Sequence, residues 1–223
     1  MILDLSDPAR TREVTQWEPA LDPPAGVQYQ LHHPIVAGET AYMGWWNYGV
    51  LLADISTPEQ PRIIGHLGGW APAQGGHTHT ALPLLQRKLL VLTDEAAGVP
   101  GEETRKFIRV VNMQDPGALT LESICPVPDG DFGRNGVRFG PHNVHENRPG
   151  SFTSERVIFA TYFGAGLRVY DISNAAHPRE IAHFVPDPDE RGYVPINDIF
   201  VDEKGLIYLT DRRDGNLYIV EMT

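Results

Sequence analysis

The chain has 223 residues, of which 41% are hydrophobic and 21% charged, and a formal net charge of −11 at pH 7. Such a composition predicts a soluble globular protein of one or two domains. The acidic balance argues against nucleic acid and against an anionic membrane surface as partners. The single Cys125 excludes an intramolecular disulfide and a Cys-rich zinc ribbon. No membrane span and no secretory signal are evident, so we expect a cytoplasmic protein.

The chain begins with an incomplete structural unit. Residues 2–5 and 11–17 match a third and a fourth strand without a first and a second. Short runs with period-two alternation, bounded by Gly, Pro, Asn and Asp, predict strands here and in the rest of the chain. No segment shows a sustained helical period, so helices should be minor.

Three units of four strands follow, and the chain ends with a first, second and third strand. Each first strand begins at a His or an Asn, at residues 33, 79, 142 and 197. The second strands are predicted at 40–46, 89–93, 157–162 and 206–210, and the third strands at 50–56, 108–112, 167–173 and 217–220. The fourth strands are predicted at 61–67, 119–124 and 178–184, each after a turn.

The strand starts are 46, 63 and 55 residues apart, with extra length in loops at 95–105, 126–140 and 186–195. Repeats of ~40–50 residues with four strands each are typical of β-propeller blades. We therefore predict one all-β domain over residues 1–223, a β-propeller with three complete blades and partial terminal ones. Residues 11–17 could supply the missing fourth strand of the last blade, which would leave residues 2–5 without a place in any blade. Alternatively, the chain is part of a larger ring.

The unit VYDISNxxxPREI at 169–181 resembles the LVIVD-repeat β-propeller proteins of bacteria. The segments GPHNVHENRPGSF at 140–152 and GHTHT at 76–80 resemble the same family, and the resemblance extends over nearly the whole chain. Members are usually longer, with about seven blades. The resemblance thus implies the propeller fold and a chain that is the C-terminal portion of a larger ring. It implies little about the reaction.

Four first-strand residues should converge on the propeller axis: His33, His79, His142 and Asn197. His77 is two residues before His79 and should share its face of the strand. Neutral imidazoles bind divalent transition metals such as Fe, Zn, Mn or Cu. We expect His33, His79, His142 and His77 to be metal ligands; the alternative is a polar channel that binds only water.

Other polar residues could support the site. Asn197, His145, Glu146 and Arg148 could orient an imidazole or form an ion pair. Asp94 and Asp211 follow equivalent second strands and are interpreted as turn residues rather than catalytic carboxylates.

These observations favour a metal-dependent enzyme, an oxidoreductase or a hydrolase, that acts on a small organic molecule at the channel mouth. Two alternatives remain open. One is a non-enzymatic scaffold that binds a protein or another ligand at its loops, and the other is a fragment that works only after self-association through its open blade edges.

Overall fold

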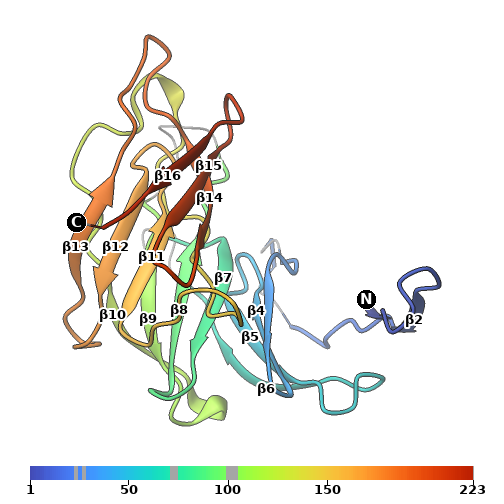
Figure 1. Cartoon of the computed structure of the whole chain (residues 1–223). Helices are drawn as coiled ribbons and strands as arrows, with labels where there is room; N and C mark the ends of the chain where they lie inside the picture. The colour runs from blue at the N-terminus through green and yellow to red at the C-terminus, as the bar shows by residue number, and fades with distance from the viewer. Residues whose placement is uncertain (23–24, 27–28, 71–74, 99–104, 223) are drawn as a thin grey trace.

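The computed structural model describes residues 1–22, 25–26, 29–70, 75–98 and 105–222. Four antiparallel sheets follow one another in chain order, preceded by a separate hairpin (Figure 1). The hairpin is β1 (Ile2–Asp4) with β2 (Arg12–Thr15). Sheet 1 contains β3 (Pro34–Ala37), β4 (Thr40–Gly44), β5 (Val50–Asp54) and β6 (Arg62–Leu67), and sheet 2 contains β7 (Thr78–Leu84), β8 (Leu89–Asp94), β9 (Ile108–Asn112) and β10 (Thr120–Ile124). Sheet 3 contains β11 (Val157–Thr161), β12 (Leu167–Asp171) and β13 (Arg179–Phe184), and sheet 4 contains β14 (Ile196–Val201), β15 (Ile207–Asp211) and β16 (Leu217–Val220).

The turn between the third and fourth strands is closed by the same ion pair in three places. An aspartate ends the third strand, accepts a hydrogen bond from the backbone two residues later, and pairs with the arginine that begins the fourth strand. The pairs are Asp4–Arg12 at 2.9 Å, Asp54–Arg62 at 2.5 Å and Asp171–Arg179 at 2.8 Å. The hairpin β1–β2 is therefore the same structural module as β5–β6 and β12–β13.

The prediction of an all-β chain with four-stranded antiparallel units is confirmed, but the number of complete units is not. Sheets 1 and 2 have four strands, whereas sheet 3 has three. The expected first strand at His142 is reduced to an isolated bridge between Val144 and Ala160. Backbone hydrogen bonds of His142, Asn143 and His145 still join this segment to β11, and the His145 ring also accepts one from Val201 of sheet 4.

The described sheets do not close into a ring. β2 pairs with β1, and no fourth strand lies beside β16 in the described part of the chain. The expected closure of the last sheet by residues 11–17 is therefore not present in this structure. Figure 1 shows the hairpin at the end of an extended linker, away from the C-terminal sheet.

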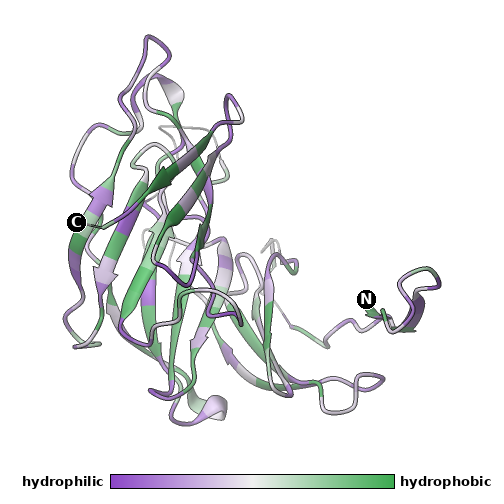
Figure 2. Cartoon of the chain, viewed as in Figure 1, coloured by the Kyte–Doolittle hydropathy of each residue, from purple (hydrophilic) through white to green (hydrophobic). Residues whose placement is uncertain are grey.

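The core lies within and between the sheets. Strand residues carry most of the hydrophobic colour in Figure 2, and the connecting loops are mainly hydrophilic. Strand β7 is buried along its whole length and packs beside β3 and β4, and β11 packs beside β14. The 3-10 helices described are Pro116–Ala118 and Arg134–Gly136. Among the described residues, no helix is long and apolar enough to cross a membrane.

Candidate metal centre

The first strands start at one repeated backbone position, and His32, His79, His142 and Asn197 occupy it. The backbone N–H of His32 donates to Gly44 at 2.9 Å, and that of His142 donates to Thr161 at 3.0 Å. In sheets 2 and 4 the pairing register shifts at the same place, which makes His79 and Asn197 the extra residues of β-bulges.

This register places His32, rather than His33, at the position of His79 and His142. In a regular strand, His33 would point toward the axis. The extra residue of the bulge shifts the inward-facing position by one, from His33 to His32. His33 instead meets Glu146, with 2.9 Å between its Nε2 and the carboxylate Oε1. The expectation that His33 is a metal ligand stays a prediction. The carboxylate that contacts His33 belongs to Glu146 and not to Glu95.

Glu95 is the central carboxylate of the site, and its side chain is buried. It follows β8 by one residue, and by strand register its equivalents in sheets 1, 3 and 4 are Trp46, Phe163 and Arg212. All four positions face the histidines. Trp46 stacks on His32 with 5.3 Å between ring centroids, and Phe163 stacks on His142 at 4.8 Å.

Three imidazoles surround the Glu95 carboxylate, and we call His32, His79, His142 and Glu95 the His/Glu cluster. The Nε2 atoms of His32 and His79 lie 3.4 and 3.9 Å from Oε2, and that of His142 lies 3.8 Å from Oε1. One ligand atom from each of His32, His79 and Glu95 lies within 4.8 Å of the others. A single ion could therefore reach these three residues after small side-chain movements.

Hydrogen bonds orient two of the rings. Nδ1 of His79 lies 2.6 Å from the Thr80 hydroxyl, and Nδ1 of His142 lies 2.7 Å from the Asn197 carbonyl oxygen. A carbonyl only accepts, so His142 carries its proton on Nδ1, and its Nε2 lone pair faces Glu95. Such partners fix the tautomer of metal-binding histidines. Asn197 thus supports His142 through its backbone rather than through its amide.

Burial keeps the histidines neutral. It lowers the pKa of His79 to about 2, with the neighbouring His142 and His32 adding to the effect. Burial also lowers the pKa of His142 and of His32, although Glu95 opposes the shift in both. Neutral imidazole is the form that binds metals, so protons compete weakly for these nitrogens.

The other predicted residues lie around the cluster. Glu146 bridges His33 and Arg148, whose guanidinium reaches its Oε2 at 2.6 and 2.9 Å. Burial tends to raise the pKa of Glu146, but His33 and Arg148 outweigh it and hold the pKa below its usual value. The predicted ion pair in the segment 145–148 is therefore Glu146–Arg148.

His145 and His77 have other contacts. His145 accepts from the Val201 backbone N–H at Nδ1, and its Nε2 faces the Phe152 carbonyl at 2.8 Å, so both nitrogens serve the fold. His77 has a φ of +63°, which breaks the alternation expected between it and His79. Its ring stacks on Trp46 at 4.4 Å, and its Nδ1 lies 3.2 Å from the Glu95 backbone oxygen. His77 is beside the cluster and not among the three residues that converge.

A pocket of about 450 Å³ opens over the cluster. Its walls include His32, His33, His79 and His142, and its far side is formed by residues 143–146, Arg148 and the segment 198–200. A small molecule in this space would lie beside the His32, His79 and His142 side chains. The Glu146–His33 pair would flank it.

The fold and the site define a class: a repeat protein of consecutive antiparallel sheets with imidazoles at equivalent strand starts. Residues 159–185 match the family described as LVIVD repeat. This segment is similar to the LVIVD repeat, and the resemblance read from the sequence is confirmed there. No curated protein matches the chain.

Two solved structures are similar to the chain. The computationally designed Ika4 protein superimposes with a TM-score of 0.53 at 8% identity, over 89% of this chain and 95% of that one. This likeness concerns the fold alone. A hypothetical selenium-binding protein from Sulfolobus tokodaii matches with a TM-score of 0.31 at 13% identity, over 86% of this chain and 65% of that one. That score is too low to support an argument.

Proposed function

We propose that the chain binds one divalent transition metal at the His/Glu cluster and acts on a small organic molecule in the pocket above it. The convergence of His32, His79 and Glu95 carries this proposal. Two imidazoles and a carboxylate suit Zn, Fe(II) or Mn, and leave coordination positions open. The Nε2 of His142 is a candidate fourth ligand.

The charges around Glu95 support a role for Oε2 as a ligand. Arg138 donates to Oε1 at 3.1 Å and Arg212 lies 3.8 Å from the same oxygen, whereas Oε2 faces His32 and His79. The arginines therefore balance the carboxylate from one side. The oxygen that faces the imidazoles stays available to a cation.

A bound metal would act as a Lewis acid or redox centre, which fits a hydrolase or an oxidoreductase. The residues of the chain would bind and position the substrate. The Glu146–His33 pair lies on the pocket wall at hydrogen-bonding distance, so a proton could move between the two groups and a ligand beside them. Arg148 holds Glu146 ionised and fixes its direction.

We further propose that the four sheets are successive blades of a β-propeller with the cluster near the axis. The support is the equivalence of the cluster residues. His32, His79 and His142 come from the starts of sheets 1, 2 and 3, and Glu95 and Arg212 from the same point of sheets 2 and 4. Equivalent positions of successive blades meet at such an axis.

A matched pair of variants tests the metal proposal. Protein purified without chelator is analysed for transition metals, and Zn²⁺ binding to chelator-treated protein is measured by calorimetry. We expect about one equivalent of metal, with His32→Ala losing it and His33→Ala retaining it. The proposal fails if the wild type binds no metal, or if His33→Ala loses the ion and His32→Ala does not.

One observation favours self-association as a second candidate. Strand β16 is an open edge with Leu217 and Ile219 more than half exposed, and the separate hairpin carries a fourth strand of the repeat type. A second copy could place its β2 beside β16. Light scattering would give a dimer mass that Leu217→Lys reduces to the monomer, whereas a monomeric wild type would refute this candidate.

A further inference from the structure

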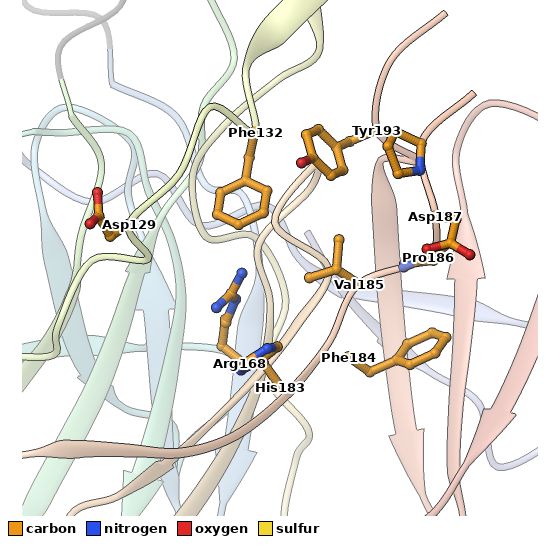
Figure 3. A pocket seen from close by; sticks show the side chains of 10 residues that line it. Asp129, Phe132, Arg168, His183, Phe184, Val185, Pro186, Asp187 and Tyr193 are labelled. Carbon is orange, nitrogen blue, oxygen red and sulfur yellow. The ribbon is translucent and has the colours of Figure 1, made fainter. Parts of the chain in front are cut away.

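A second pocket lies in sheet 3, away from the His/Glu cluster. It has a volume of about 550 Å³ and shares none of its lining residues with the pocket over the histidines. Figure 3 shows Phe132 and Tyr193 at its upper side, Arg168 below Phe132, and Phe184 and Val185 along its lower side. Asp129 and Asp187, both exposed, lie at opposite ends.

Arg168 is a buried cation with an unsatisfied amino group. Its side chain is only 5% exposed. Nε donates to the Ala165 carbonyl at 2.9 Å and Nη1 donates to Glu180 at 3.1 Å. Nη2 is buried and has no hydrogen-bond partner in the described part of the chain. An unpaired buried donor costs about 1–3 kcal/mol, and more when it is charged, so this group calls for an acceptor.

Sheet 2 shows how the same position is satisfied elsewhere. Arg109 is the equivalent of Arg168, because each is the second residue of the third strand in its sheet. Arg109 forms a buried ion pair with Asp94, the last residue of the second strand. The equivalent of Asp94 in sheet 3 is Tyr162, whose hydroxyl donates to the Lys106 carbonyl. Sheet 3 therefore keeps the arginine but has no carboxylate at the position of Asp94, and Glu180 pairs with Nη1 of Arg168 alone.

An aromatic ring packs against the guanidinium of each arginine. The Arg109 guanidinium lies 4.2 Å from the ring centroid of Trp70, and that of Arg168 lies 5.0 Å from the centroid of Phe132. Each aromatic residue belongs to the loop that leads into the sheet. Phe132 also meets the edge of Tyr193, at 5.1 Å between centroids. The pocket thus combines a buried guanidinium with the aromatic rings of Phe132, Phe184 and Tyr193 on a wall that also carries polar groups.

We propose that this pocket binds a small carboxylate with an apolar ring, whose carboxylate takes, on Arg168, the role that Asp94 has on Arg109. Nη2 is closed to solvent, so binding requires the half-buried Phe132 ring to shift and then pack against the ligand. The aromatic wall takes the ring, and the carboxylate accepts from Nη2. This site is independent of the metal proposal.

The test measures 3-phenylpropionate binding to the full chain by NMR titration, with its uncharged amide as the matched compound. We expect saturable shifts for residues around Arg168 and Tyr193. The amide should bind about tenfold more weakly or worse, because a charge-assisted hydrogen bond is lost.

Three variants complete the experiment. We expect Arg168→Lys to weaken binding about tenfold, because lysine lacks the planar guanidinium. We expect the same loss for Tyr193→Ala, which removes a ring from the pocket wall. Arg179→Met, an exposed arginine of the same sheet, should bind as the wild type does. Equal binding of acid and amide overturns the proposal, as does an absence of saturable shifts in the wild type. Tyr193→Ala keeps the test valid if Arg168→Lys fails to fold, and unchanged affinity in that variant also refutes the site.

Discussion

Two adjacent carboxylates at the end of β8 have opposite surroundings. Asp94 is fully buried and faces Arg109, a permanent cation on the next strand. Glu95 faces three imidazoles that burial keeps neutral, with Arg138 and Arg212 on its other side, 32% and 50% exposed. One carboxylate is matched by a fixed charge of the fold. The other has two arginines at Oε1 and faces imidazole nitrogens at Oε2, where an added cation could bind.

The neighbours of Asp94 and Glu95 distinguish the two carboxylates better than their positions in the sequence do. Both residues follow a strand, and by composition alone Asp94 is as good a candidate as Glu95. The difference lies in what the neighbouring groups are: a guanidinium cannot give up its proton, whereas a neutral imidazole can bind a metal. Asp94 should therefore govern stability, and Glu95 should govern metal binding.

The largest effect is expected for Asp94→Asn. Removing one partner of a buried ion pair leaves an uncompensated charge on Arg109, and we expect a loss of about 3–5 kcal/mol in the free energy of unfolding. Urea unfolding followed by circular dichroism measures it. Asp187→Asn, an exposed control, should stay within about 0.5 kcal/mol of the wild type. A stable Asp94→Asn variant would show that the pair is not structural.

Glu95→Gln should produce the reverse pattern. Its arginine neighbours are exposed enough to be hydrated, so the stability of the metal-free protein should fall by about 1 kcal/mol or less. Zn²⁺ affinity should fall about a hundredfold or more, since even outer partners of metal ligands are worth 10- to 100-fold. Calorimetry with Zn²⁺ gives the affinity. A variant that binds Zn²⁺ like the wild type would assign the ligand role to another group.

A smaller effect concerns pH. The folded state lowers the pKa of His79 and His142 below the unfolded value near 6.5, so below that pH the unfolded chain takes up more protons. Metal-free protein should therefore hold its stability above about pH 6.5 and lose about 1.4 kcal/mol per pH unit for each such histidine as the pH falls. Urea midpoints between pH 5 and 8 measure the slope.

His79→Gln serves as the control for this prediction. The pH slope of the variant should be smaller than that of the wild type by the contribution of about one histidine. Stability that is constant down to pH 5 would mean that the cluster histidines are protonated in the folded state.

The sequence predicted much of the fold because the repeat recurs four times. Alternation and the turn before each fourth strand identified the third and fourth strands. The first strand predicted for sheet 3 is an irregular segment that is hydrogen-bonded to β11, and its His145 ring also contacts sheet 4. Such a contact joins residues far apart in the chain, and strand periodicity carries no trace of it.

The residues of the cluster were predicted only in part. His79 and His142 are in the cluster, and His32 occupies the equivalent position in sheet 1 because bulges at the strand starts shift the register. The ligand role expected for His33 stays a prediction. Glu95 was missed, although a signal existed. Asp94 and Asp211 were already seen as equivalent, and the next residues, Glu95 and Arg212, are the ones that face the histidines.

The donors of the His/Glu cluster come from three different sheets, and this has a consequence for how the molecule unfolds. Stacked repeats usually separate one by one, since each contacts only its neighbours. An ion held by His32, His79 and Glu95, with His142 as fourth ligand, would tie sheets 1, 2 and 3 to one point. The three sheets could then open only together, with the ion released, so metal would convert a chain of local unfolding steps into one cooperative transition.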